Sequence, residues 1–292
     1  MSTDYDVVVV GGRVAGASTA MLLARAGARV ALVDRATYGS DTISTHGLMR
    51  AGVMQLSRWG LLDEVTAAGT PPIRRTLFHY ADGEPEQVSI RSTAGVDALY
   101  APRRPVLDRM LVDAAAEAGA EVRHESTVTS LLRDESGRVG GVRVRSRSGT
   151  VVELRATITV GADGIRSTVA EQAGAPVLRR GRSGSAFLYR YYADAQPLGY
   201  ELGYAVGGAA GFIPTNDGLT CVFVGATPAR VRALRRDGTE QAFAVLLSET
   251  APRLADRVVA AQPAGRIRGW AGVPGFIRRS WGPGWALVGD AG

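Results

Sequence analysis

The sequence predicts an α/β protein that combines a parallel sheet flanked by helices with a second domain rich in antiparallel strands. Three observations favour this class. The apolar run at residues 7–10 leads into a glycine turn and an alanine- and leucine-rich stretch, two later apolar runs close on glycine and aspartate, and alternating segments with turn signals fill much of the remainder. Continuous β-branched runs are typical of strands buried in parallel sheets, and alternation is typical of antiparallel strands.

The first of these segments predicts a strand, a helix and a second strand in succession. We expect the first strand over residues 7–10, a helix over 17–26 that ends at Gly27, and a second strand over 29–34. The second strand closes on Asp34, an acid 23 residues after Gly11. This is a βαβ unit of the size that binds dinucleotides.

The glycines and the acid have separate physical roles in such a unit. Gly11 permits the tight turn, Gly16 allows the helix to approach the strand, and Asp34 can accept a hydrogen bond from a ribose hydroxyl. The helix amino terminus attracts a pyrophosphate. Arg13 stands where the second glycine of G-x-G-x-x-G is usual. The unit predicts a dinucleotide site without distinguishing NAD from FAD.

Charge and composition exclude several other functions. The chain has 292 residues and a net charge of +6, and all 34 basic residues are arginine. Without a lysine, Schiff-base enzymes, P-loop nucleotidases and Ser-x-x-Lys hydrolases are excluded. The arginines occur as scattered pairs rather than in a run, so we expect no nucleic-acid binding.

Cysteine, histidine and hydropathy patterns predict whether the chain has disulfides, a metal site or a membrane span. Cys221 is the single cysteine, so no internal disulfide forms, and we expect it to be a core residue. The three histidines are far apart, which predicts no metal site. The acidic N-terminus is no signal peptide and no apolar run reaches 18 residues. We therefore expect a cytoplasmic protein without a membrane span.

Two later motifs, taken together with the first, indicate which kind of dinucleotide the chain binds. Residues 157–167 read TITVGADGIRS, and residues 285–292 read WALVGDAG. Together with VVVVGGRVAG at residues 7–16, they resemble the flavoprotein monooxygenase superfamily, which includes para-hydroxybenzoate hydroxylase-like and geranylgeranyl reductase-like enzymes. The resemblance implies a Rossmann-like FAD-binding domain, which contains the parallel sheet with helices and a small antiparallel sheet, and an antiparallel-sheet substrate domain.

The resemblance also implies which residues hold FAD. The Asp-Gly motif would lie near the pyrophosphate and the NAD(P)H approach, Asp290 would hold the ribityl chain, and Val128 would meet the adenine. Arg50, in RAGVM, and Arg104, in RPVL, match arginines that contact the cofactor. The full implied set is Gly11, Gly12, Arg13, Val14, Ala15, Gly16, Asp34, Arg35, Arg50, Arg104, Val128, Asp163, Gly164, Gly289 and Asp290. Thr45 and His46 are the catalytic candidates near the flavin.

Domain boundaries follow from the same alignment. We expect residues 1–70, 100–178 and 279–292 to form the FAD-binding domain, and residues 71–99 and 180–278 to form the substrate domain. Predicted helices cover residues 50 to about 65, 106–118 and 241–249, and predicted hairpins cover 142–152 and 211–225. An aromatic group alternates along strands and can line an apolar pocket or pack within the sheet: Phe187, Tyr189, Tyr191, Tyr192, Tyr200 and Tyr204.

Three functions remain open. The main expectation is an FAD monooxygenase that uses NAD(P)H as a transient reductant to hydroxylate or epoxidise an aromatic or polyketide-like molecule. The alternative is a non-oxygenating reductase of the geranylgeranyl reductase type, although residues 211–214 lack the tryptophan of that segment. Ala170 replaces a common arginine, which weakens the usual NAD(P)H docking, and the absence of lysine excludes halogenases. Because the chain stops inside its last motif, a truncated, non-catalytic flavin binder is the third.

Overall fold

The computed structural model describes residues 4–44, 47–80 and 83–292. The chain forms two compact units. Unit 1 comprises Met1–Asp41, Arg104–Arg180 and Phe276–Gly292, and unit 2 comprises Thr42–Arg103 and Gly181–Gly275. Unit 1 holds all three glycine motifs, and unit 2 holds the aromatic strands. Compared with the predicted domains, residues 42–70 and 100–103 fall in unit 2, and residues 180 and 276–278 fall in unit 1. The assignment of the units to FAD and substrate stays a prediction.

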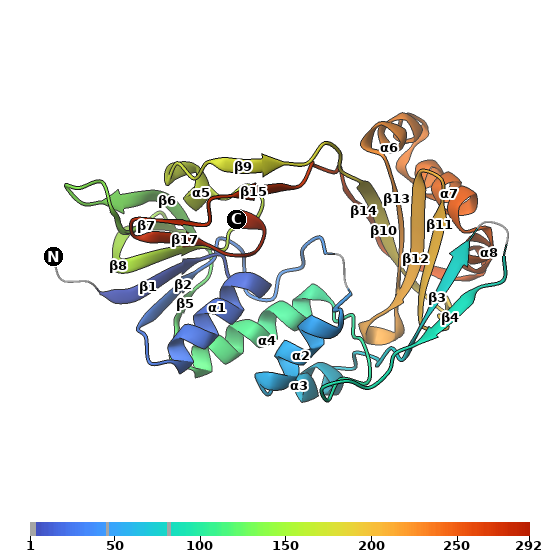
Figure 1. Cartoon of the computed structure of the whole chain (residues 1–292), viewed down its shortest axis with the longest axis horizontal. Coiled ribbons are helices and arrows are strands. Elements are labelled where there is room, and N and C mark those ends of the chain that lie inside the picture. Colours follow the sequence, from blue (N-terminus) through green and yellow to red (C-terminus); the bar gives the residue numbers. More distant parts are fainter. Residues whose placement is uncertain (1–3, 45–46, 81–82) are drawn as a thin grey trace. The chain divides into compact units, whose positions relative to one another are not determined.

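Unit 1 is built on a parallel sheet (Figure 1). Its strand order is β16-β17-β8-β1-β2-β5, and every pair is parallel except β16–β17. The strands are β1 (Tyr5–Val10), β2 (Val30–Val33), β5 (Glu121–Arg123), β8 (Val151–Gly161), β16 (Trp281–Gly282) and β17 (Trp285–Leu287). Val9 pairs with Leu32 on one side and with Val160 on the other, so the apolar run forms a central, buried strand as predicted. The predicted fold class is confirmed.

A small antiparallel sheet extends from the same long strand. β6 (Ser126–Arg133) pairs with β7 (Val139–Ser146), and β7 pairs with the first half of β8, whose second half enters the parallel sheet. The second strand of the predicted hairpin at residues 142–152 is thus the same strand, β8, that leads into the Asp-Gly motif. Val8, Val10 and Val33 pack against Val142 and Leu154 of this small sheet.

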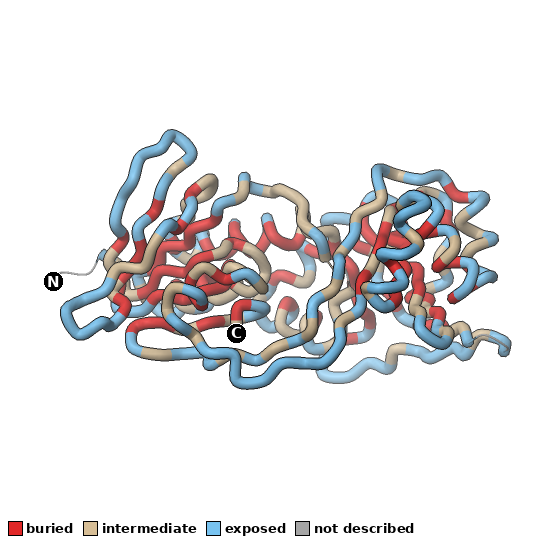
Figure 2. Tube along the Cα trace, turned by 90° about the horizontal axis from the view of Figure 1, so that it is seen from above, coloured by how far each residue is buried: buried red, intermediate tan, exposed pale blue. Residues whose placement is uncertain are grey.

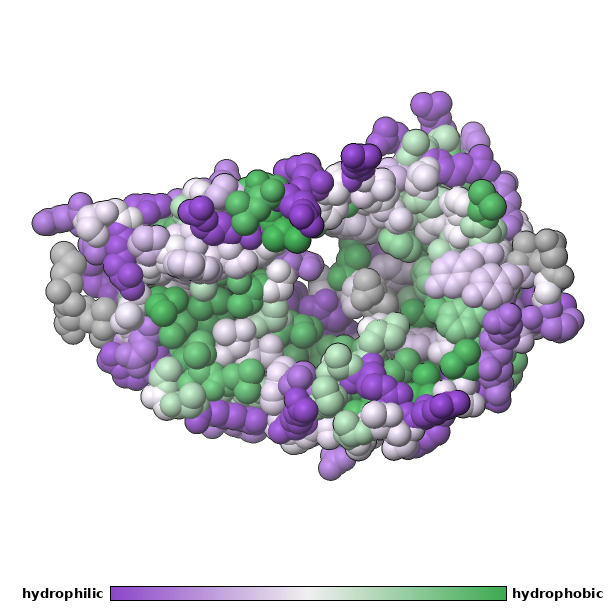
Figure 3. Space-filling view, viewed as in Figure 1, coloured by the Kyte–Doolittle hydropathy of each residue, from purple (hydrophilic) through white to green (hydrophobic). Residues whose placement is uncertain are grey.

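Helices cover the parallel sheet because its strands are apolar on both faces. α1 (Val14–Arg25) and α4 (Arg104–Glu117) lie beside each other, and the short α5 (Thr168–Gln172) follows β8 (Figure 1). Figure 3 shows apolar residues gathered over α1. The two predicted helices correspond to α1 and α4, each displaced by two or three residues at its start. A two-stranded ribbon of β9 (Val177–Arg180) and β15 (Phe276–Arg278) also belongs to unit 1.

Unit 2 is built on a mainly antiparallel sheet of order β14-β10-β13-β12-β11-β3-β4. The single parallel pair among these strands joins β11 to β3. The strands are β3 (Arg75–Tyr80), β4 (Glu86–Ser89), β10 (Ala186–Ala193), β11 (Tyr200–Ala205), β12 (Gly208–Pro214), β13 (Thr220–Ala226) and β14 (Gln262–Trp270). Figure 2 shows the central strands of both sheets as buried and the connecting loops as exposed.

One face of this sheet is covered by helices. α6 (Pro228–Leu234), α7 (Thr239–Thr250) and α8 (Pro252–Ala260) lie against it (Figure 1). Phe243 and Leu247 of α7 and Leu254 of α8 are buried with Phe212 and Val222 of the sheet. α7 confirms the predicted helix at residues 241–249, while α6 and α8 were not predicted.

Two turns show what the sequence did and did not predict. The hairpin β12–β13 is present, and Asp217 and Gly218 adopt φ of 65° and 66° at its turn, the backbone conformation that an Asp-Gly pair favours. The single helix predicted from residue 50 to about 65 is wrong. The chain forms α2 (Arg50–Arg58) and α3 (Leu62–Ala67), separated at Gly60, where φ is 78°. A positive φ ends a right-handed helix.

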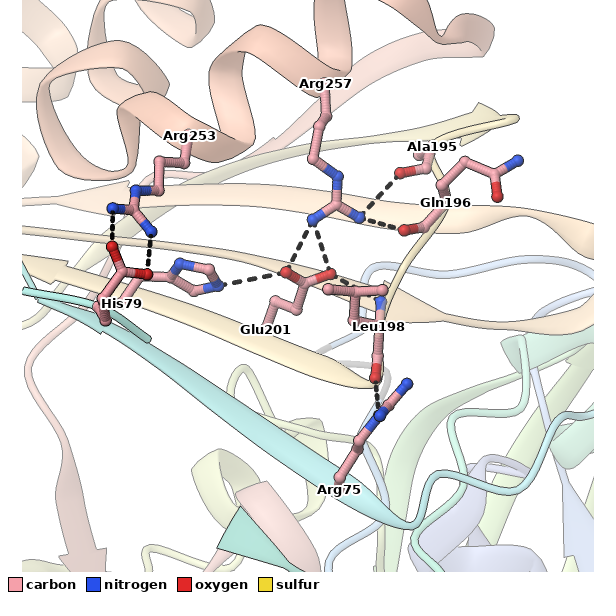
Figure 4. Close-up of polar contacts among 9 residues, drawn as sticks. Arg75, His79, Ala195, Gln196, Leu198, Glu201, Arg253 and Arg257 are labelled. Carbon is pink, nitrogen blue, oxygen red and sulfur yellow. Dashed lines mark hydrogen bonds and ion pairs between the residues drawn. The ribbon is translucent and has the colours of Figure 1, made fainter. Parts of the chain in front are cut away.

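A buried ionic cluster joins β3, β11 and α8 beneath the helical layer (Figure 4). The Glu201 side chain is 0% exposed and accepts hydrogen bonds at 2.8 and 3.0 Å from Arg257 Nη1. The Leu198 amide donates to Glu201 Oε1 at 2.8 Å, and His79 Nε2 lies 3.2 Å from Oε2. Arg257 Nη2 also donates to the carbonyls of Ala195 and Gln196. Each oxygen of the buried carboxylate therefore has at least one donor, as buried charges require.

Two further findings concern membrane-spanning helices and the single cysteine. No helix in residues 4–44, 47–80 and 83–292 is long and apolar enough to cross a membrane. Cys221 is buried on β13, and burial raises the pKa of its thiol well above the usual range. The thiol is therefore a core group, in agreement with the sequence-based expectation.

Candidate cofactor site

The amino end of α1 is shaped by two glycines that no other residue can replace. Gly11 has φ of 105°, and a Cβ there would lie 2.4 Å from the Ala162 carbonyl oxygen. A Cβ on Gly16 would lie 1.7 Å from the Gly11 carbonyl oxygen. The first amides of α1 have no helical partner, as at every helix start, and remain available to an anion. The backbone thus forms the cradle that a dinucleotide diphosphate needs.

A buried carboxylate lies beside this cradle. Asp34 Oδ2 accepts the Gly12 amide at 2.5 Å, and Oδ1 accepts the Ala36 amide at 2.6 Å. These bonds hold the carboxylate at the end of β2, where its remaining lone pairs can accept ribose hydroxyls. A cavity opens next to it, lined by Gly12, Arg13, Asp34, Ala36, Thr37, Gly39, Asp108, Arg109, Val112 and His124.

The three glycine motifs meet at this end of the sheet. The Ala162 amide donates to the Val10 carbonyl at 2.7 Å, so the Asp-Gly motif follows directly beside the first motif. A Cβ on Gly289 would lie 2.8 Å from the Ala15 Cβ, which places the Gly-Asp motif at the amino end of α1. The reason is topological: β17, β8 and β1 are parallel neighbours, so their carboxyl ends share one edge.

Within the second motif, Asp163 has a structural task in unit 1. Its Oδ1 accepts the Ser167 hydroxyl at 2.5 Å, and its Oδ2 accepts the Val169 amide at 3.2 Å. Ser167 in turn accepts the Ala170 amide as the N-cap of α5. Gly164 takes φ of 81° at the turn between them. A cofactor contact by Asp163 or Gly164 stays a prediction.

The remaining predicted residues are distributed as follows. Arg35, Gly289 and Asp290 are exposed, and Val128 is buried in the core of unit 1. Arg50 belongs to unit 2, where it donates to the backbone carbonyls of Val96 and Arg91 at 2.9 and 2.7 Å. Thr45 and His46, the catalytic candidates, lie outside the described residues. Their roles stay predictions.

One residue of the site was missed by sequence reasoning. Asp108, on α4, binds both Arg13 and Arg104 through its carboxylate. The signal that indicates it is an Arg-x-x-x-Asp pair, four residues apart on a predicted helix. Its contact with Arg13 joins residues 95 apart in the chain, so no local pattern reveals it.

The aromatic group of unit 2 is divided between the two faces of the sheet. Tyr189, Tyr191 and Tyr200 form an apolar cluster with Ile213 and Cys221 on the face opposite the helices. The other members pack in pairs: Tyr192 with Phe243 of α7, Tyr204 with Tyr80, and Phe187 with Phe223. The tyrosines of the first face are buried as well, at 3–7% exposure, and Tyr192 belongs to the helical core.

Within the part of the chain that the structure describes, no three histidine, cysteine, aspartate or glutamate side chains gather in a way that could hold an ion. The residues of unit 1 instead fit a dinucleotide: a backbone cradle, a fixed carboxylate and arginines beside it.

Replacing Asp34 with alanine is expected to weaken FAD binding by at least about tenfold, because it removes an anchored acceptor and frees the Gly12 and Ala36 amides. The measurement is the dissociation constant from flavin fluorescence titration of the apoprotein. Asp134→Ala is the matched control, since Asp134 also accepts two backbone amides but lies in the β6–β7 turn. Equal affinities in the two variants would contradict a role of Asp34 in the site.

Comparison with known proteins places these features in a family. A family model described as "FAD binding domain" matches residues 4–259. Digeranylgeranylglycerophospholipid reductase 2 of Methanopyrus kandleri is 30% identical over 304 positions, which cover 99% of this chain and 70% of the relative.

Solved structures agree with this match. The myxobacterial chondrochloren halogenase CndH superimposes with a TM-score of 0.84 at 25% identity, covering 98% of this chain and 68% of the halogenase. PqsL, a probable FAD-dependent monooxygenase from Pseudomonas aeruginosa, superimposes with a TM-score of 0.79 at 25% identity, covering 98% and 78%.

Proposed function

The chain belongs to the FAD binding domain family and is an FAD-dependent oxidoreductase, and we propose that it is a reductase acting on carbon–carbon double bonds of an apolar, isoprenoid-type substrate. The observation that carries the proposal is the likeness, over 99% of the chain, to a reductase of a digeranylgeranyl lipid. The proposal favours the alternative function over the main expectation from the sequence.

The residues of unit 1 would hold the cofactor. Gly11 and Gly16 leave room for the diphosphate at the amino end of α1, and Asp34 is anchored to accept ribose hydroxyls. When bound, FAD would supply two-electron redox chemistry. NAD(P)H as the source of these electrons stays a proposal.

The tyrosine-lined face of unit 2 would bind the substrate. Tyr189, Tyr191 and Tyr200 are buried in an apolar cluster with Ile213 and Cys221, and we propose that this face of the sheet carries the isoprenoid chain. The Cys221 thiol is uncharged at neutral pH because burial raises its pKa, so it adds no charge to this face.

Monooxygenation is the second candidate function. It is favoured by the likeness to PqsL and by the absence, in residues 211–214, of the tryptophan that the reductases carry in the corresponding segment. Halogenation is not proposed despite the likeness to CndH. Halogenases of this superfamily require a lysine, and this chain has none.

Anaerobic turnover separates the two candidates. With dithionite as the reductant and a geranylgeranyl lipid as the substrate, we expect the flavoprotein to add two hydrogens per double bond without oxygen, measured by mass spectrometry of the lipid. Oxygen uptake stoichiometric with NADPH consumption, and products that gain one oxygen atom, would contradict the reductase. A flavin-loaded protein that fails both assays would support the third, non-catalytic function.

A further inference from the structure

One buried carboxylate in unit 1 is shared by two guanidinium groups. The Asp108 side chain is 4% exposed. Arg104 donates to it through Nε at 2.8 Å and Nη2 at 3.0 Å, and Arg13 donates through Nη1 at 2.9 Å. Two positive charges on one negative charge leave a net charge of +1 among the three side chains, next to the amino end of α1.

The same group connects three segments that are distant in sequence. Arg13 is the N-cap of α1, and Arg104 and Asp108 occupy the first two turns of α4. Arg13 also donates to the Ser40 carbonyl at 2.5 Å and to the Ser40 hydroxyl at 2.9 Å. Ser40 belongs to the loop that follows Asp34. The Asp108 cluster, defined as Arg13, Ser40, Arg104 and Asp108, therefore fixes the loop and both helices together.

The conformation of Arg13 explains why the second glycine is dispensable. Its φ of −93° and ψ of −172° are extended values that any residue adopts. Its side chain makes no capping hydrogen bond to α1 in the described structure and extends instead to Asp108 and Ser40. The departure from G-x-G-x-x-G thus introduces a guanidinium that is anchored by Asp108 and Ser40.

We propose that Asp108 is a positioning residue of the dinucleotide site, which orients Arg13 and Arg104 so that their net positive charge acts on the diphosphate of FAD. The inference rests on FAD being the cofactor and goes beyond the proposed reaction, because it holds for reduction and for oxygenation alike. Guanidiniums held before the ligand arrives lose less conformational freedom on binding.

The proposal predicts whether one substitution raises or lowers the dissociation constant of FAD. Asp108→Asn keeps the shape of the side chain and removes its charge. By charge alone, loss of a carboxylate near a diphosphate strengthens binding. By positioning, it weakens binding, because the two guanidiniums lose the group that orients them. We expect the dissociation constant of FAD to rise at least about tenfold.

The experiment is a flavin fluorescence titration of the full-length apoprotein at several sodium chloride concentrations. Glu117→Gln is the matched control, because it removes one carboxylate from an exposed site on the same helix; we expect its affinity to stay within about twofold of the original. Asp108→Asn is also expected to reduce the salt dependence of FAD binding, because Arg13 and Arg104 are then no longer oriented to act on the diphosphate. A purely structural loss would lower the affinity and leave that dependence unchanged.

Three results would overturn the inference: FAD affinity in Asp108→Asn that is unchanged, affinity that is increased, or affinity that falls with unchanged salt dependence. If Asp108→Asn does not fold, the Arg13→Met variant tests the inference instead, because the extended backbone of Arg13 accepts any residue. We expect Arg13→Met to weaken FAD binding and to reduce the salt dependence of that binding. Failure of the original protein to bind FAD would contradict the assignment of FAD as its cofactor. Normal binding without lipid reduction would contradict only the proposed function.

Discussion

Substituting Arg257 with methionine is expected to lower the free energy of unfolding by about 3–5 kcal/mol, the typical cost of leaving a buried charge without its partner. Glu201 is fully buried, and Arg257, which is 28% exposed, is its cationic partner. His79 Nε2 remains 3.2 Å from the carboxylate but supplies a single contact. The substitution also removes donors from the Ala195 and Gln196 carbonyls.

The test is urea denaturation followed by circular dichroism. Arg253→Met is the matched control on the same helix, because Arg253 pairs with Glu84 at the surface. Exposed pairs contribute about 0–1 kcal/mol, so this variant is expected to remain near the original stability. Removing both charges in Glu201→Leu/Arg257→Leu is expected to recover part of the loss. Equal stability of the Arg257 and Arg253 variants would show that burial does not govern the cluster.

Substituting Gly16 with alanine is expected to abolish FAD binding and to destabilise unit 1. The added Cβ would lie 1.7 Å from the Gly11 carbonyl oxygen and 3.0 Å from the Ala162 Cβ. Neither neighbour can move easily, because one is backbone and the other follows the central strand β8. The helix must therefore move away from the strand, and the amides that would contact the diphosphate move with it.

The measurement is the flavin content of the purified protein, from its visible absorbance, together with its thermal unfolding. Gly140→Ala is the control, since a Cβ at this position of β7 would meet nothing within 4 Å among the described residues. It is expected to retain flavin and to melt near the original temperature. A Gly16→Ala protein with full flavin content would contradict the close packing of α1 on β1.

Local patterns predicted much of this protein, and the reason is physical. The run at residues 7–10 is short, β-branched and apolar at every position, which favours a strand covered on both faces. Gly11 and Gly16 follow it at fixed spacing because a Cβ at either position would meet backbone atoms. The Asp-Gly turn of β12–β13 is equally local. The prediction failed between α2 and α3, where helical periodicity continues through Gly60 although its backbone leaves the helix.

By itself the sequence determined the βαβ unit, the three motifs and the absence of lysine chemistry, because each depends on residues close in the chain or on composition. Only the tertiary structure decided which charged side chains form buried ion pairs. The contacts of Asp108 with Arg13 and of Glu201 with Arg257 join residues 95 and 56 positions apart. Their energies depend on burial and on the partners that the folded sheets bring together, and no local spacing encodes either quantity.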